Sequence, residues 1–275
     1  MSDLEGKVVI ITGVGRPRGV GRAAALRYAG KGAKLVLADL GSSDNAIGDI
    51  EGTSPDLNRV AAEVAAAGGD AIAVATDVSK EADVKRLIEQ AVDKYGRIDS
   101  MIANAAILAG KGDPLDISLE TFMRIQEVNV AGVFLCLRES VRQMRAQGGG
   151  GSIVTVGSRA SRRGDANIAA YSASKFSVLG LTQSFAMAYA KDGIRINCVC
   201  PGAVDTEMYV RQTNDFAGRE GVDFETAKKQ MGDVIPLGRL TSGDDVAKAI
   251  VWFTSDETSH VTGQAFNVNG GSWMN

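Results

Sequence analysis

Histidine is almost missing from this chain of 275 residues, which contains a single one, His260. A Ser-His-Asp hydrolase would need that residue as its base, and a zinc site would need it together with the few cysteines. The sequence also lacks the G-x-S-x-G pattern of many hydrolases and the G-x-x-x-x-G-K-[ST] pattern of a phosphate-binding loop. We therefore expect neither hydrolase chemistry nor a metal site.

Cysteine is scarce too. Cys136, Cys198 and Cys200 are too few for a disulfide framework and are typical of a reducing compartment. The N-terminus has no signal-peptide pattern. The uncharged stretch Phe176–Ala190 is shorter than the roughly 20 residues that span a bilayer. With 30 Lys and Arg against 33 Asp and Glu, no charge excess points to a polyanion. We expect a cytoplasmic protein without nucleic-acid or membrane partners.

Glycine, by contrast, is abundant, with 33 residues against only 5 prolines. Because proline is scarce and no repeat is evident, this is not a collagen-like or low-complexity excess. The glycines predict a backbone that turns tightly or comes close to a ligand.

Apolar runs alternate with longer helical patterns along the whole chain. The runs are continuously apolar, as strands buried on both faces of a parallel sheet are. This alternation predicts an α/β fold: one doubly wound, Rossmann-type domain over residues 1–275, with a central seven-stranded parallel sheet and helices on both faces. The predicted strands are Lys7–Thr12, Leu35–Ala38, Ala71–Ala75, Met101–Asn104, Ile153–Val156, Arg195–Val199 and Ala265–Val268, and the predicted helices are Val20–Lys31, Leu57–Ala67, Glu81–Tyr95, Leu119–Gln147, Tyr171–Lys191 and Asp244–Ser255.

Two segments break the alternation. Gly41–Pro55 is a polar, acidic loop, and Thr206–Arg239 has no strand character and only a weak helical pattern around Phe224–Met231. Long irregular segments in a compact domain often form lids or binding loops, so we expect a substrate loop at about 206–239. The four glycines Gly148–Gly151 are interpreted as a helix stop and a turn into the fifth strand.

A glycine cluster joins the first predicted strand to the first predicted helix. Such glycines let backbone N–H groups and the positive end of a helix dipole meet a pyrophosphate. An ordinary turn would also use glycine, but the first strand–helix junction is where dinucleotides bind in open α/β sheets. The predicted cofactor loop contains Gly13, Gly15, Arg18, Gly19, Val20 and Gly21.

Asp39 ends the second predicted strand, where an acidic residue can accept hydrogen bonds from the adenosine ribose. Its carboxylate would repel a 2′-phosphate, which favours NAD over NADP. The alternative is a solvated turn residue before Gly41. Arg16 and Arg18 favour NADP instead, because either guanidinium could pair with its 2′-phosphate. We expect NAD, with NADP as the less favoured cofactor.

Tyr171 and Lys175 are separated by one helical turn and share a face of their predicted helix. An ammonium beside the phenol would favour the phenolate and lower the pKa of Tyr171 from about 10 toward neutrality. Such a Tyr is a usable acid or base in a protein with almost no His. The alternative is an exposed Tyr and a solvated Lys.

With these residues the sequence resembles the compact single-domain branch of the short-chain dehydrogenase/reductase family, from about Gly6 to Gly271. The resemblance includes Ser158, which precedes Tyr171 by the interval usual in the family. The other matching motifs, in order, are the Thr12-Gly13 glycine loop, Asp77-Val78, Asn104-Ala-Ala106, Asn129, Tyr171-x-x-x-Lys175, Asn197 with Pro201-Gly202, and Asn269-Gly270-Gly271.

The resemblance implies a role for each matching residue. Tyr171 would exchange a proton with the substrate oxygen, Lys175 would hold the nicotinamide ribose, and Ser158 would hydrogen-bond the substrate oxygen. Asn129 would hold a water that links Lys175 to solvent. The remaining residues would bind the cofactor: Asp77 and Val78 at the adenine, Asn104, Ala105 and Ala106 beside the cofactor, and Pro201, Gly202, Val204 and Thr206 around the nicotinamide.

Three departures from the family pattern are visible. The glycine loop is two residues longer than usual, or Gly15 replaces its first glycine. Ala106 stands where glycine is usual, and Asn269 where aspartate is usual. Asn104 could equally be a structural strand-end residue. No departure removes a catalytic group.

The expected function is NAD-dependent interconversion of a secondary alcohol and a ketone, in a homotetramer whose main interface uses Leu119–Gln147 and Tyr171–Lys191. The alternatives are an NADPH-dependent 3-oxoacyl or carbonyl reductase and, more remotely, a non-catalytic nucleotide sensor. Arg159, Arg162 and Arg163 form a basic cluster after Ser158 that could bind an anionic substrate or could be a solvated or subunit-contact patch.

Overall fold

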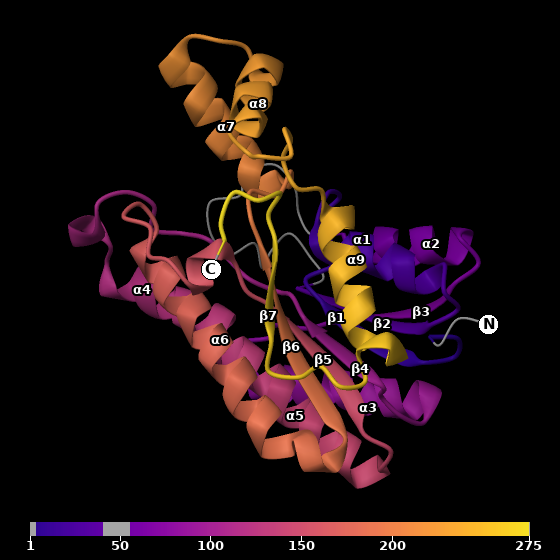
Figure 1. Cartoon of the computed structure of the whole chain (residues 1–275). Coiled ribbons are helices and arrows are strands. Elements are labelled where there is room, and N and C mark those ends of the chain that lie inside the picture. The colour runs from indigo at the N-terminus through magenta and orange to yellow at the C-terminus, as the bar shows by residue number, and fades with distance from the viewer. Residues whose placement is uncertain (1–3, 41–55, 275) are drawn as a thin grey trace.

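The computed structural model describes residues 4–40 and 56–274, so the predicted loop Gly41–Pro55 lies outside the described residues. Seven parallel strands form one sheet in the order β3-β2-β1-β4-β5-β6-β7 (Figure 1). The predicted fold class is confirmed. The strands are β1 Val8–Thr12, β2 Lys34–Asp39, β3 Asp70–Ala75, β4 Ser100–Ala103, β5 Gly151–Val156, β6 Ile194–Pro201 and β7 Ala265–Val268.

The chain order of the strands reverses between β1 and β4. Val9 of β1 pairs with Leu35 of β2 on one side and with Ser100 of β4 on the other. Strands β1 and β4 are buried along their whole length, as their apolar sequences predict. The edge strand β3 is half exposed, because it has a neighbour on one side only. The reversal leaves a crevice at the carboxyl ends of the two central strands.

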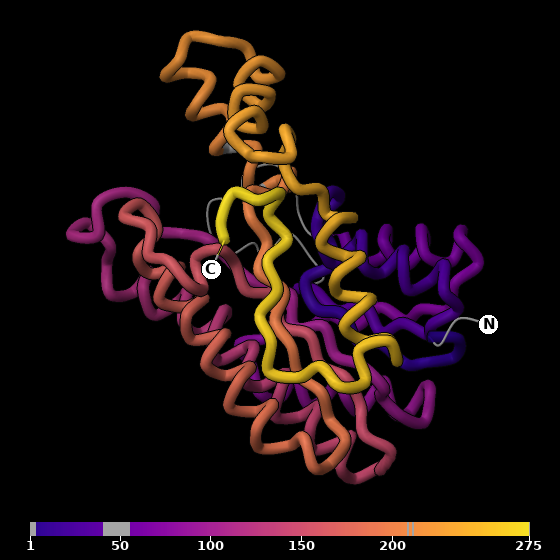
Figure 2. Tube along the Cα trace, viewed as in Figure 1, coloured from indigo at the N-terminus to yellow at the C-terminus, as the bar shows by residue number. Residues whose placement is uncertain are grey.

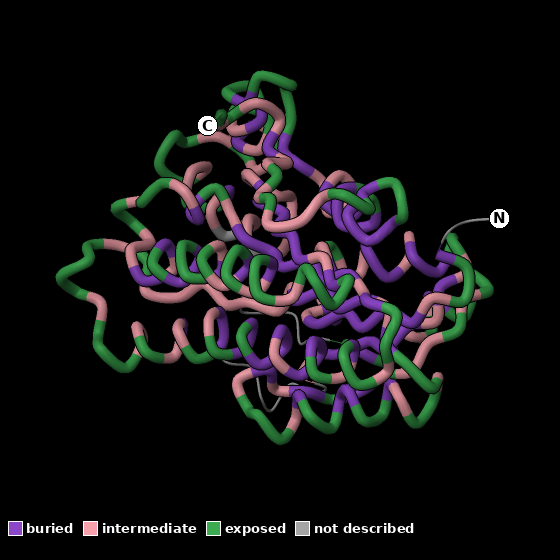
Figure 3. Tube along the Cα trace, turned by 60° about the horizontal axis from the view of Figure 1, so that its bottom comes forward, coloured by how far each residue is buried: buried purple, intermediate pink, exposed green. Residues whose placement is uncertain are grey.

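Helices cover both faces of the sheet and enclose two apolar cores (Figures 1 and 3). One core packs α3, α5 and α6 against the sheet, and the other packs α1, α2 and α9 against the opposite face. Helices α2, α3, α5 and α6 also carry exposed residues, whereas α1 has none, and Figure 3 shows how buried and exposed residues alternate along the helical turns. Their bounds are α1 Val20–Ala29, α2 Leu57–Ala66, α3 Glu81–Tyr95, α5 Gly132–Gln147, α6 Ala169–Tyr189 and α9 Gly243–Thr254.

The helix predicted over Leu119–Gln147 is confirmed in its bounds but contains a π-helical turn. It consists of α4 (Leu119–Gln126), the π-helical turn η3 (Glu127–Ala131) and α5, without a break between them. The π turn was not predicted, because it leaves no mark in hydrophobic periodicity. Such turns often occur at functional sites.

The segment Thr206–Arg239 is more regular than predicted. It holds two helices, α7 (Glu207–Glu220) and α8 (Phe224–Asp233), which form a hairpin that projects from the carboxyl edge of the sheet (Figures 1 and 2). Helix α7 was missed because polar and charged residues outnumber apolar ones along Glu207–Glu220. Helix α8 lies at the predicted weak helical pattern, and Asp223 caps it by accepting a hydrogen bond from the Thr226 N–H.

The glycine run after α5 acts as predicted. Helix α5 ends at Gly148, and Gly148, Gly149 and Gly150 all have positive φ before β5 begins at Gly151. A Cβ on Gly150 would lie 2.4 Å from the Gly193 carbonyl oxygen, so the turn also packs against the start of β6. Among the described residues, no helix combines the length and apolarity needed to cross a bilayer.

Candidate active site

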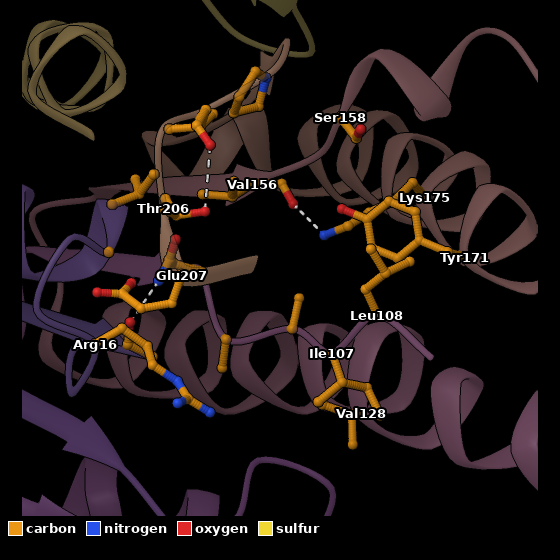
Figure 4. Close-up of a pocket in the computed structure, with 18 of the residues that line it drawn as sticks. Arg16, Ile107, Leu108, Val128, Val156, Ser158, Tyr171, Lys175, Thr206 and Glu207 are labelled. Atoms are coloured by element: carbon orange, nitrogen blue, oxygen red, sulfur yellow. Dashed lines mark hydrogen bonds between the residues drawn. The ribbon is translucent and has the colours of Figure 1, made fainter. Parts of the chain in front are cut away.

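A cavity of about 360 Å³ opens at the carboxyl ends of the strands, beside the β1–β4 reversal. Its walls come from the segments that follow β1 to β6 and from the start of α7. Figure 4 shows Ser158, Tyr171 and Lys175 at one end, and Arg16 and Glu207 at the other. The predicted site residues that line this cavity are Gly13, Gly19, Val20, Asp39, Asp77, Val78, Asn104, Ala105, Ala106, Ser158, Tyr171, Lys175, Pro201, Gly202, Val204 and Thr206.

Four predicted residues, Gly15, Arg18, Gly21 and Asn129, do not line this cavity. Gly21 is buried under the loop, and a Cβ there would lie 2.4 Å from the Gly13 carbonyl oxygen. Gly13 has a φ of +73°, and a Cβ on it would lie 2.7 Å from the Ala105 Cα. These glycines therefore allow α1, the loop and the strand end after β4 to pack closely.

Helix α1 begins at this loop with Gly19 as its N-cap and no side-chain cap. The first-turn N–H groups of a helix without such a cap are available to an anion, and the helix dipole favours negative charge there. This cradle, which bulkier residues would fill, fits the diphosphate of a dinucleotide.

Asp39 is tied to the glycine loop as well as facing the cavity. Its Oδ2 accepts a hydrogen bond from the Gly15 N–H at 2.8 Å, and its Oδ1 accepts one from the Leu40 N–H at 2.8 Å. Gly15 thus holds the carboxylate of Asp39 at the end of β2. Both oxygens keep a further lone pair for ribose hydroxyls.

Arg18 contacts the start of the α7–α8 hairpin. Its backbone N–H donates to Glu207 Oε1 at 2.8 Å, and its guanidinium pairs with Asp205 at 3.3 Å. Asp205 also pairs with Lys228 of α8 at 2.6 Å. Arg18 therefore joins the glycine loop to the hairpin, a link that sequence reasoning missed because Asp205 and Glu207 are distant in the chain.

Asn104 connects the two central strands at the site. Its side-chain amide donates to the carbonyls of Thr12 and Gly13, both at 2.9 Å. Its own backbone N–H donates to Thr12 Oγ1 at 3.1 Å. Asn104 is thus structural and also lines the cavity. Ala106 meets no strain, since no non-glycine residue among the described ranges has positive φ.

Asp77 follows β3 at another wall of the cavity. Its Oδ1 accepts hydrogen bonds from the N–H and hydroxyl of Ser79, at 3.0 and 2.6 Å. Arg124 of α4 lies 4.0 Å from Asp77 Oδ2 and lines the same wall, together with Val128. This wall presents both charged and apolar surface.

Lys175 is buried on the second turn of α6, one turn after the half-buried Tyr171. Its Nζ donates to the Val156 carbonyl at 2.8 Å and lies 5.5 Å from the centre of the Tyr171 ring (Figure 4). Ser158 follows β5 and lines the same end of the cavity as Tyr171. The three side chains therefore converge at one end of the cavity.

The pKa values at this end differ from the sequence expectation. Burial raises the pKa of Tyr171 to about 12, and the hydrogen bond from Ser158 lowers it only in part. Burial also lowers the pKa of Lys175 to about 8. The expected shift of Tyr171 toward neutrality is wrong for the protein alone, because desolvation of the phenolate outweighs the attraction of an ammonium directed at Val156.

Asn129 lies in the π-helical turn and is fully buried. Its Nδ2 donates to the Ile107 carbonyl at 2.9 Å and to Ser174 Oγ at 3.1 Å, while its Oδ1 accepts from the Ile107 N–H at 2.8 Å. Asn129 thus ties the segment after β4 to α6, one residue before Lys175.

The segment after β6 forms the wall opposite Tyr171. Gly202 packs against Asn269, where a Cβ would lie 2.7 Å from the Asn269 Cβ. The side chain of Asn269 is fixed by two hydrogen bonds. Its Oδ1 accepts from the Gly271 N–H at 3.0 Å, and its Nδ2 donates to the Trp273 carbonyl at 2.8 Å. The C-terminal motif thus supports the wall formed by Pro201 to Thr206.

The three arginines after Ser158 diverge. Arg159 lines the cavity and pairs with Asp165 at 3.0 Å. Arg162 donates to the Ala265 carbonyl at 2.7 Å, and the Arg163 guanidinium lies 5.4 Å from the centre of the Trp273 ring. They do not form one basic patch, so any anion-binding role rests on Arg159.

Several cavity residues carry no motif. They come from the glycine loop, the segment after β4, α4 and η3, the residue before α6, and α7. Most of them have no sequence signal beyond proximity to a motif residue. They are Arg16, Ile107, Leu108, Arg124, Val128, Ile168, Glu207, Tyr209 and Gln212.

Comparison with known proteins agrees with this geometry. A family model described as enoyl-(acyl carrier protein) reductase matches residues 13–272. Sorbitol dehydrogenase of Cereibacter sphaeroides is 32% identical over 98% of this chain and 99% of its own. The 2,5-dichloro-2,5-cyclohexadiene-1,4-diol dehydrogenase of Sphingobium indicum is 37% identical over 98% of each chain. The crystal structure of levodione reductase matches with a TM-score of 0.85 and 31% identity, over 98% of both chains.

These matches define a nicotinamide-dependent oxidoreductase of the Rossmann type, acting on CH–OH groups. The chain belongs to the short-chain dehydrogenase/reductase family.

Proposed function

We propose that this protein is an NAD-dependent dehydrogenase that interconverts a secondary alcohol and a ketone, with Tyr171 as its acid and base. The observation that carries the proposal is the position of Ser158, Tyr171 and Lys175 at one end of a cavity whose other end is the glycine-loop cradle.

The residues present fit a dinucleotide. The uncapped start of α1 at Gly19 and Val20 would hold the diphosphate, and Asp39 would accept hydrogen bonds from the adenosine ribose. Asp77 and Val78 would border the adenine, and the segment from Pro201 to Thr206 the nicotinamide. The bound nicotinamide supplies hydride transfer, which no side chain of the protein can perform.

The protein's own residues handle the proton and the substrate oxygen. Tyr171 donates its proton to a ketone oxygen in reduction and accepts it from an alcohol in oxidation. Ser158 hydrogen-bonds the same oxygen and stabilises its developing charge. The buried ammonium of Lys175 favours the phenolate electrostatically whenever Tyr171 has given up its proton.

The proposed substrate carries a second oxygen function beside the reacting alcohol. Arg159, Tyr209 and Gln212 line the cavity and can hydrogen-bond such a group, while Leu108 and Ile168 supply apolar surface. The relatives named for sorbitol and for a cyclohexadiene diol support this class. Because Arg159 is already paired with Asp165, a neutral hydroxyl is favoured over a carboxylate.

A reductase of carbonyl or 3-oxoacyl substrates with NADPH is the second candidate. Arg16 lines the cavity and could meet a 2′-phosphate, and the matching family model carries a reductase description. The position of Asp39 favours NAD over this alternative.

One experiment separates these possibilities. The purified protein is given matched pairs of secondary mono-alcohols and vicinal diols with NAD⁺ or NADP⁺, and formation of the reduced cofactor is followed by absorbance. We expect the highest kcat/KM with a diol and NAD⁺. A preference for NADP⁺ would refute the argument from Asp39, and equal rates for both members of every pair would refute the substrate class.

We also propose a cytoplasmic homotetramer. Phe134 of α5, with Phe176 and Met187 of α6, are large apolar residues exposed on the two helices expected to form the main interface. Their contact with a second copy would cover this surface. Light scattering on the eluting protein should give four times the chain mass of 28.7 kDa, and a monomer mass would contradict the assembly.

A further inference from the structure

Ser161 is a fully buried serine at the end of the short 3₁₀ turn η4 (Arg159–Ser161), three residues after Ser158. Ser158 is the N-cap of that turn, and the two serines form a reciprocal capping box. The Ser158 N–H donates to Ser161 Oγ at 3.1 Å, and the Ser161 N–H donates to the Ser158 carbonyl at 2.9 Å. Ser161 thus fixes the backbone from which the Ser158 side chain projects.

The same turn sets the direction of the Ser158 hydroxyl. Its Oγ accepts a hydrogen bond from the Ala160 N–H at 3.1 Å, which occupies one lone pair and resists rotation of the side chain. The hydroxyl proton remains available toward Tyr171 and the reacting oxygen. The orientation that Ser158 needs for its role therefore depends on the integrity of this turn.

Ser161 also lies close to the sheet. Its Oγ and the Cys200 Sγ both border the space that a Cβ on Gly157 would occupy. Cys200 belongs to β6, which is paired on both sides, so this neighbour of Ser161 is held rigidly. The absence of a side chain at Gly157 makes room for both atoms, because a Cβ there would lie 2.7 Å from Ser161 Oγ and 3.0 Å from Cys200 Sγ.

We propose that Ser161, through the capping box it forms with Ser158, is a positioning residue that fixes the Ser158 hydroxyl for the reaction. This inference rests on the proposed role of Ser158 in alcohol–ketone interconversion. Ser161 touches neither the cavity nor the substrate and acts only through Ser158. No sequence motif gives Ser161 a role. Its capping box with Ser158 and its complete burial are the observations that indicate one.

The first test is Ser161→Ala. We expect kcat to fall about tenfold, the size of effect that a misplaced catalytic group produces. The KM for NAD⁺ and the Kd for NADH, measured by fluorescence, should stay within twofold of wild type. The pH dependence of alcohol oxidation should move to higher pH, because an oriented Ser158 lowers the pKa of Tyr171.

Ser152→Ala is the matched control. Ser152 is also a buried serine of the β5 segment, and its hydroxyl donates to the Phe253 carbonyl at 3.0 Å, far from the cavity. The Ser152→Ala variant should lose about as much thermal stability as Ser161→Ala, but its kcat should not fall. If both variants lose kcat in proportion to their loss of stability, Ser161 is merely structural and the proposal is overturned.

The decisive measurement adds Ser161→Ala to a Ser158→Ala background. If Ser161 acts through Ser158, the second substitution should cost less than twofold there. A further tenfold loss would overturn the proposal. Should Ser161→Ala fail to fold, Ser161→Gly and Ser161→Cys replace it: only the glycine variant should show the full loss, since the Cys side chain keeps a weak hydrogen-bond acceptor for the Ser158 N–H. If Ser158→Ala alone leaves kcat unchanged, the proposed function fails, independently of Ser161.

Discussion

The ammonium of Lys175 donates a hydrogen bond to the carbonyl of Val156, 2.8 Å away, in the buried floor of the cavity. No carboxylate among the described residues forms an ion pair with this ammonium. Burial therefore lowers the pKa of Lys175 to about 8, against the opposing influence of the Cys198 and Cys200 thiols. The charge at this position therefore costs stability, and in the proposed function it is kept because it serves the reaction.

Replacing Lys175 by Met should stabilise the protein and inactivate it. A folded-state pKa lowered from 10.5 to about 8 costs about 3 kcal/mol at neutral pH. The Val156 carbonyl would lose its donor, which offsets about 1 kcal/mol. We expect the free energy of unfolding in urea to rise by about 2 kcal/mol at pH 7, with turnover down at least about 1,000-fold.

The stability gained by Lys175→Met should depend on pH. The cost of the Lys175 charge is fully present below pH 8 and disappears as pH rises toward 10.5, so the advantage of Lys175→Met should vanish by pH 10.5. Lys191→Met, at an exposed residue, serves as the control and should show no such pH dependence. An advantage of Lys175→Met that is constant with pH would contradict the electrostatic explanation.

Alcohol oxidation should accelerate with pH, because it needs the phenolate of Tyr171 and burial holds the pKa of this phenol at about 12 in the protein alone. We expect kcat/KM for the alcohol to rise severalfold or more between pH 7 and 9, while ketone reduction, which uses the neutral phenol, stays flat. Tyr171→Phe should lose both activities by at least about 1,000-fold and still bind NADH. Substantial residual turnover in that variant would refute the assigned role of Tyr171.

Much of the fold could be predicted from the sequence, because continuous apolar runs such as Val8–Thr12 are imposed by burial on both faces of a parallel sheet. The glycine loop was recognisable because Gly13 and Gly21 permit contacts that a Cβ would block. What could not be predicted depends on tertiary contacts. The π-helical turn at Asn129 has no periodicity signal, and the helical pattern of α7 was obscured because polar and charged residues outnumber apolar ones along it.

The direction of the pKa shifts also required the structure. Sequence spacing placed Lys175 beside Tyr171, but it could not show that the ammonium is directed at Val156 or that burial raises the pKa of the phenol. Likewise, three arginines close in sequence proved to have three separate partners, because Arg162 and Arg163 turn toward the C-terminal segment.

Asp39→Asn should shift cofactor preference toward NADP. The substitution removes the negative charge that repels a 2′-phosphate. At contact distance this repulsion amounts to up to about a few kcal/mol. The amide oxygen can still accept from the Gly15 N–H, so the glycine loop keeps its support. The ratio of kcat/KM for NADP⁺ to that for NAD⁺ should rise at least about tenfold. Asp39→Ala, which also loses the Gly15 contact, should weaken binding of both cofactors, and an unchanged ratio in Asp39→Asn would show that Asp39 does not select the cofactor.

Glu207 places a carboxylate at the glycine loop, where its Oε1 accepts from the Arg18 N–H at 2.8 Å. Its Oε2 is buried and has no hydrogen-bond partner among the described residues. A diphosphate bound at the start of α1 would meet this negative charge, so Glu207→Gln should lower the Kd for NADH about threefold to tenfold, measured by fluorescence titration. Glu207→Ala also removes the hydrogen bond between α7 and the glycine loop. Hydrogen exchange in α7 and α8 should therefore become faster in that variant only. Glu220→Gln, at an exposed residue on the same helix, should change neither property, and an unchanged NADH affinity in Glu207→Gln would show that the two negative charges do not interact.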